Sequence, residues 1–185
     1  MKNLIKFIII FSILSTPVQA ACDFLIDIGD SGKKVFDKFD MPLPGYKGQY
    51  YLPVPSPELC PNDNLNDDIA VEYVFLGETE DAAKLAAIRM IVMNDGKNTE
   101  NNKLTLMRYV KKVYGDFDTG QNPQIFDSFK IWEKSNNDVI VYKRMLGEEE
   151  LFEEELMITT VEYDEKLGKF YYDLEVESEK MEQQQ

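Results

Sequence analysis

The stretch KLTLMRYVKKVYGDFDTGQNPQIFDSFKIWEKSNNDVIVYKRML (Lys103–Leu146) decides the fold of this chain. Its first part places apolar residues on one face of a helix, and Gly115 is a typical helix end. Two runs rich in β-branched and aromatic residues follow, 129–132 and 139–142, separated by the turn Ser135-Asn136-Asn137. The stretch therefore predicts a helix, a loop and a β-hairpin that form one α+β unit.

Four further segments have the residue pattern of β-strands. Segment 70–76 alternates apolar with polar residues, 156–163 is predicted as a strand, and 169–177 alternates most regularly, after a predicted turn at 164–168. Segment 84–93 is ambiguous, because its alanines favour a helix whereas its β-branched residues suit a buried strand. We favour the strand, since a hairpin with 70–76 then follows.

The remaining segments complete the predicted domain. A short helix begins at Asp30 or Ser31 and presents Val35, Phe36 and Phe39. Segment 41–64 holds six of the eight prolines and predicts an extended strap, with a polyproline ligand as the alternative. The whole predicts one α+β domain over 21–177, an antiparallel sheet of about six strands in meander hairpins with two short helices packed on one face. Residues 178–185 are expected to form a flexible tail.

Residues 1–20 have the features of a secretory signal peptide. Lys2 and Lys6 precede an apolar run that is too short for a membrane anchor, so the mature chain is expected to begin at Ala21 without a transmembrane segment. Export favours a disulfide between the two cysteines, Cys22 and Cys60. Lipid attachment to Cys22 is the alternative, but it would leave Cys60 unpaired. The sequence therefore predicts a periplasmic or secreted bacterial protein.

Composition excludes several classes of function. The chain has no histidine, which removes Ser-His-Asp and Cys-His catalysis and histidine-bound zinc. Its formal net charge of -14 argues against nucleic acid or an anionic membrane as a partner. An Asn/Asp cluster at 62–68 departs from the calcium-loop pattern and predicts a solvated turn. We expect no catalytic residue, metal or cofactor.

A glutamate-rich segment is the main candidate for a binding surface. A structural interpretation is a charged edge or turn that prevents self-pairing of the sheet. A functional interpretation is an acidic patch that binds a basic partner. The residues are Glu148, Glu149, Glu150, Glu153, Glu154 and Glu155.

Three single residues stand out beside this segment. Asp127 lies between aromatic residues and is a mild candidate for carboxylate catalysis, although a turn role is favoured there. Arg89 lies in an apolar run, where pairing with a buried acid, binding of an anion, or an edge-strand position facing solvent would explain it equally well. Trp132 is expected to pack in the core.

These observations favour a non-catalytic, exported binding or accessory module of the cell envelope. One alternative is an inhibitor or immunity-like protein that masks a basic enzyme. A carboxylate-dependent hydrolase is the other alternative, and it requires two converging acids in a concave site.

Overall fold

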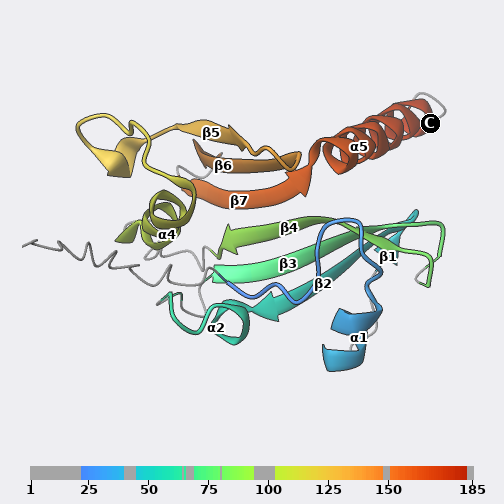
Figure 1. Ribbon diagram of the computed structural model, residues 1–185. Helices are drawn as coiled ribbons and strands as arrows, with labels where there is room; N and C mark the ends of the chain where they lie inside the picture. Colours follow the sequence, from blue (N-terminus) through green and yellow to red (C-terminus); the bar gives the residue numbers. More distant parts are fainter. Residues whose placement is uncertain are drawn as a thin grey trace, which may run out of the picture.

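The computed structural model describes residues 22–39, 45–63, 65, 69–79, 81–93, 103–147 and 151–182, so the predicted signal peptide lies outside it. Seven strands of this part form one antiparallel sheet in the order β1-β2-β3-β4-β7-β6-β5, as Figure 1 shows. The strands are β1 (Gly45–Tyr46), β2 (Gln49–Pro55), β3 (Ile69–Leu76), β4 (Lys84–Val92), β5 (Ser128–Glu133), β6 (Asp138–Leu146) and β7 (Phe152–Thr160). The helices are α1 (Lys33–Phe39), α2 (Ser56–Leu59), α4 (Thr105–Tyr114), the 3-10 turn η1 (Pro123–Ile125) and α5 (Val161–Glu182). The predicted α+β class is confirmed.

The two predicted hairpins form. β3 pairs with β4, which confirms 84–93 as a strand, and β5 pairs with β6 across the predicted turn. Helix α4 ends at Gly115, whose φ of 112° lies in the region that favours glycine. Local sequence therefore determined these units.

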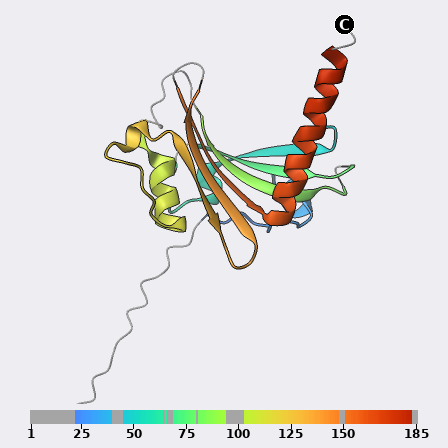
Figure 2. The ribbon, with the colours of Figure 1, turned by 90° about the horizontal axis from the view of Figure 1, so that it is seen from above.

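The two halves of the sheet are joined by a short contact. β7 pairs with β6 along its whole length, but with β4 only from Ile88 to Ile91. On the N-terminal side of Ile88, β4 no longer pairs with β7 and the two strands part. Seen from above, the two halves of the sheet run in different directions (Figure 2). The backbone of Leu85 in β4 instead forms hydrogen bonds with the N-terminal segment. Its carbonyl oxygen accepts from the Gly29 N–H at 2.7 Å, and its N–H donates to the Asp30 backbone oxygen at 2.9 Å. The parting of β4 and β7 positions the candidate site.

The main core lies on one face of the sheet. It contains Leu52, Tyr73, Met90 and Leu156, and it is covered by segment 22–28 with α1, α2 and α4. The predicted disulfide is present, since Cys22 bonds Cys60 and ties the segment to the end of α2. The two predicted helices, α1 and α4, pack on this face as expected.

The prediction of an extended proline-rich strap at 41–64 was only partly right. Its residues Gln49–Pro55 form β2, which pairs with β3 along seven residues. Pro53 and Pro55 fit there because β1 pairs only with Gln49 and Tyr50, so no strand of the described residues lies opposite the missing proline amides.

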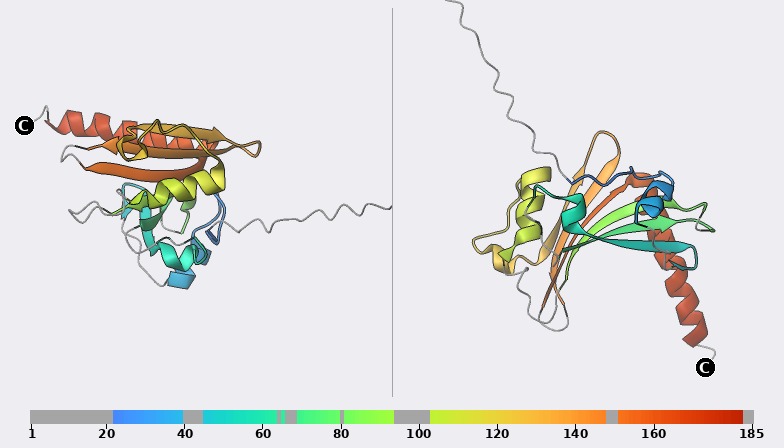
Figure 3. Two further views of the ribbon diagram at one scale, coloured as in Figure 1. Left: turned by 90° about the vertical axis from the view of Figure 1, so that its left-hand side faces the viewer. Right: turned by 90° about the horizontal axis from the view of Figure 1, so that it is seen from below.

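The predictions for the last segment were wrong. The turn at 164–168, the strand at 169–177 and the first part of the tail are all helix α5, and β7 ends at Thr160. Tyr163 and Leu167 are one helical turn apart and belong to a small cluster with Val74 of β3. Helix α5 lies on the face of the sheet opposite α1 and α2 (Figure 3). Because β7 already has a strand on each side, no position beside it remained for another strand. Among the described helices none has the length and apolarity needed to cross a membrane.

Candidate functional site

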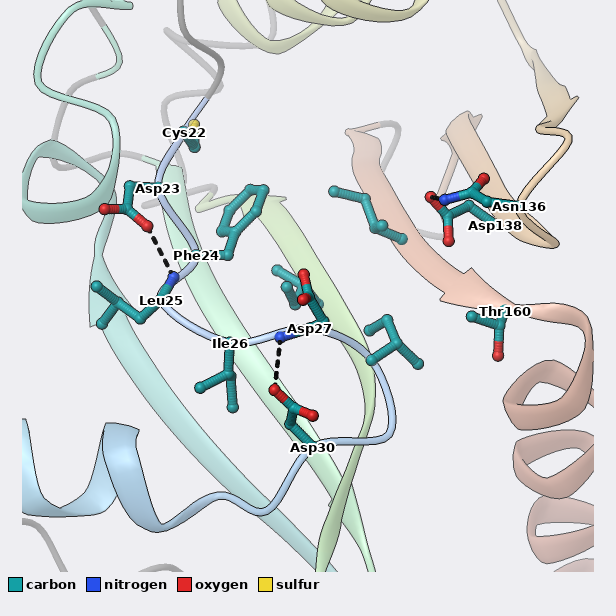
Figure 4. Close-up of a pocket in the computed structure, with 13 residues that line it drawn as sticks. Cys22, Asp23, Phe24, Leu25, Ile26, Asp27, Asp30, Asn136, Asp138 and Thr160 are labelled. Atoms are coloured by element: carbon teal, nitrogen blue, oxygen red, sulfur yellow. Dashed lines mark hydrogen bonds between the residues drawn. The ribbon is translucent and has the colours of Figure 1, made fainter.

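A groove opens where β4 and β7 part. It has a volume of about 730 Å³, and we call it the aspartate groove (Figure 4). The segment that follows the disulfide forms one wall, and the ends of the β5–β6 hairpin and of β7 form the other. Its lining residues are Cys22, Asp23, Phe24, Leu25, Ile26, Asp27, Ile28, Asp30, Ile88, Asn136, Asp138, Ile158 and Thr160.

The N-terminal wall is held along its length. The disulfide anchors one end, and the backbone bonds of Gly29 and Asp30 to Leu85 anchor the other. Between them the Tyr73 hydroxyl donates to the Phe24 backbone oxygen at 2.9 Å. The wall is therefore preorganised, although it has no helix or strand of its own.

Carboxylates surround the groove. Asp23, Asp27, Asp30 and Asp138 line it, and the lining that the described part of the chain provides contains no lysine or arginine. Asp23 accepts from the Leu25 amide at 3.0 Å and Asp30 from the Asp27 amide at 3.4 Å, whereas Asp138 accepts from the Asn136 side chain at 2.7 Å. The groove is consequently electronegative.

The acidic surface extends toward α5. An adjoining cavity of about 690 Å³ shares Ile28, Asn136 and Thr160 with the aspartate groove and adds Glu162 and Glu165. In the aspartate groove itself Phe24, Ile28, Ile88 and Ile158 supply apolar surface. A site with apolar walls and acidic groups suits a ligand that is both cationic and apolar.

Of the predicted glutamates, Glu148, Glu149 and Glu150 lie outside the described residues, so the structure does not test the charged edge or turn expected there. The other three belong to β7, which begins at Phe152 and lies inside the sheet, and of these Glu153 is exposed. Glu154 and Glu155 point to opposite faces of that strand.

Glu154 belongs to a buried ionic cluster on the core face. Its side chain and that of Arg144 are each about 1% exposed or less, with Arg144 Nε 3.7 Å from Glu154 Oε2. The Tyr142 hydroxyl donates to Glu154 Oε1 at 2.8 Å. Burial raises the pKa of Glu154 to about 7, against the opposing effects of Tyr142 and Arg144. Sequence alone could not tell which of the three consecutive glutamates 153–155 faces the core, because Glu154 lies between two others.

Glu155 forms an ion-pair network with Arg89 on the opposite face. Arg89 donates from Nε to Glu155 Oε1 at 2.6 Å and from Nη1 to Glu72 Oε2 at 2.8 Å. Burial opposes ionisation of Glu155, but the hydrogen bonds and charge of Arg89 bring its pKa below the ordinary value. Pairing of Arg89 with partly buried acids, one of the predicted alternatives, is confirmed.

This network lines a second cavity, of about 620 Å³, between α5 and the sheet. Arg89 and Lys143 are the basic residues of its lining, and Glu155 lies within reach of both. The opposite charges neutralise one another there, so this cavity has no net electrostatic preference comparable to that of the aspartate groove.

The other predicted single residues have structural positions. Asp127 is exposed and accepts from the Leu146 amide at 3.2 Å, a contact that ties the start of β5 to the end of β6. Trp132 packs against Phe117 with ring centroids 5.6 Å apart, on the core side. In the Asn/Asp cluster at 62–68, Asp63 pairs with Lys112 at 2.7 Å, and 64 and 66–68 lie outside the described residues.

Comparison with known proteins adds no further information. The chain matches no protein family, no curated protein and no solved structure.

Proposed function

We propose that this protein is an exported, non-catalytic binding module that holds a cationic, partly apolar segment of a partner protein in the aspartate groove. The observation that carries the proposal is the preformed groove with four aspartates and no basic residue among the described residues that line it. Lysine or arginine side chains of a partner would meet the carboxylates, while apolar side chains would cover Ile88 and Ile158. A basic enzyme that is masked by this protein is one partner of this kind.

Export is part of the same proposal. The signal-like residues 1–20 support it, and so does the Cys22–Cys60 disulfide, because such bonds persist in oxidising compartments. The disulfide also holds one wall of the groove, so oxidation outside the cytoplasm would complete the binding site.

A carboxylate-dependent hydrolase is less well supported. Among the described residues, burial raises the pKa of two acids, Glu154 beside Arg144 in the core and Glu72 beside Arg89. A substrate cannot reach the buried side chain of Glu154, and neither glutamate lines the aspartate groove. Neither of them can therefore act together with the groove aspartates, as such catalysis requires.

Fluorescence anisotropy tests the binding proposal. The chain is purified from the periplasm, where mass spectrometry should find a start at Ala21 and an intact disulfide. The probe is a short labelled peptide that alternates lysine with leucine, and its glutamate-leucine counterpart is the negative control. We expect the lysine peptide to bind and to weaken with added salt.

Two double variants separate the groove from overall charge. Asp27→Asn with Asp138→Asn removes one carboxylate from each wall, and we expect about tenfold weaker binding, because each exposed pair contributes up to about 1 kcal/mol. Asp81→Asn with Glu175→Gln removes the same charge outside the groove and should change binding little. Equal weakening by both variants, or absence of binding to the lysine peptide, would refute the proposal.

A further inference from the structure

Strand β5 forms an exposed edge of the sheet. It pairs with β6 alone among the described strands, and it lies at the outer end of the sheet order (Figure 1). Five of its six residues are exposed, including Phe129 at 59% and Ile131 at 43%. These two apolar side chains lie on the outer face, since Trp132, which has the opposite parity, packs against the core.

This edge has few of the features that prevent strand pairing. It contains no proline, and its register with β6 is continuous from Ser128 to Glu133. Lys130 is its one lysine. At the opposite end of the sheet, β1 is only two residues long, which is a typical protection of an edge.

Local charge favours a second copy of the same chain at this edge. The protein has a formal net charge of -14, so most of its surfaces repel one another. β5 carries one lysine and one glutamate, so its own net charge is zero. Two copies can therefore approach through β5 without bringing acid against acid.

Symmetry then selects the register. Two antiparallel copies of one strand are related by a twofold axis perpendicular to the sheet. Residues that stand opposite each other then point to the same face, so their numbers are both odd or both even. For a six-residue strand the two longest overlaps are centred on Lys130 and on Ile131. The first places two lysines directly opposite, which is unfavourable, whereas the second places two isoleucines there.

We propose that the protein forms a twofold dimer in which β5 pairs antiparallel with β5 of a second copy, centred on Ile131. Lys130 then faces Trp132 of the second copy, and Phe129 lies beside the central isoleucine pair. Backbone hydrogen bonds join the two sheets into one. The proposal does not rest on the proposed function, because β5 does not line the aspartate groove.

Sedimentation velocity over a range of concentrations tests the dimer. We expect the wild-type chain to change from monomer to dimer as concentration rises, with little effect of salt. Ile131→Lys sets two lysines opposite each other and should raise the dissociation constant about tenfold or more. Ile125→Lys is the matched control, because Ile125 is 69% exposed in η1 and outside the strand, and it should leave the dimer unchanged.

Cysteine crosslinking tests the register independently of those variants. Under mild oxidation Ile131→Cys should form an intermolecular disulfide, because the two copies of that residue are directly opposite. Lys130→Cys should crosslink far less. A chain that remains monomeric at all concentrations would overturn the proposal, as would a dimer unaffected by Ile131→Lys or preferential crosslinking of Lys130→Cys.

Discussion

Substitution of Glu154 by glutamine should remove part of the loss of stability that the wild-type protein shows as pH rises. Glutamine keeps the shape of the side chain and an acceptor for the Tyr142 hydroxyl, but it cannot ionise. Because burial raises the pKa of Glu154 to about 7, from an ordinary value of 4.5, the folded chain binds this proton more tightly than the unfolded chain. The wild-type protein therefore loses stability as pH rises through this window, and Glu154→Gln does not share that loss.

The expected size follows from proton linkage. Between about pH 5.5 and about pH 8.5, the two pKa values predict a loss of about 2 kcal/mol from Glu154. This range stays above the isoelectric point near 4.4, where solubility is lowest. The difference in unfolding free energy, Glu154→Gln minus wild type, should thus increase by about 2 kcal/mol across the range.

Urea unfolding followed by the fluorescence of Trp132 measures this difference. Glu153→Gln is the matched control on the same strand, and its difference from wild type should not change by a comparable amount, because Glu153 is exposed. A difference for Glu154→Gln that stays flat or falls with rising pH would refute the reasoning. It would mean that the ion pair with Arg144 outweighs the burial of the carboxylate.

Three further predictions concern stability. Cys60→Ser should lower the unfolding free energy by about 4 kcal/mol in the chain-entropy model, since the disulfide joins residues 38 apart. Chemical denaturation measures this loss, and a negligible loss would contradict the prediction. Gly168→Ala should stabilise by about 0.5–1 kcal/mol, because Gly168 is in the middle of α5 and a Cβ there meets no atom within 4 Å. Gly115→Ala should instead destabilise by about 1–2 kcal/mol, since its φ of 112° is strained for alanine. Thermal unfolding of the pair checks both signs, and equal effects would contradict the argument.

Sequence reasoning located much of the fold but not the site. The hairpins β3–β4 and β5–β6 and helix α4 were predictable, because their turns and periodic apolar residues act within short segments. The aspartate groove was not predictable, because its walls come from residues more than a hundred positions apart in the chain. The acids of segment 22–30 gave no sequence signal beyond their presence before α1.

The error at α5 has a physical cause. Phe170, Tyr172 and Leu174 alternate with polar residues as in a strand, but Tyr163 and Leu167 are also spaced for one helical face. The two periods lie in adjacent parts of one segment, so local pattern could not decide between them. In the folded chain the whole segment is helical, and Tyr163 and Leu167 pack against Val74 of the sheet.

The sequence by itself determined the cysteine pair, the absence of imidazole chemistry, the acidic charge and the local hairpins, because each depends on residue identity or on near neighbours. Only the tertiary structure decided that Glu154 is buried while Glu155 pairs with Arg89, that α5 is a helix, and that β4 and β7 part to open a groove. These features depend on which distant segments meet, and that is settled by packing of the whole chain.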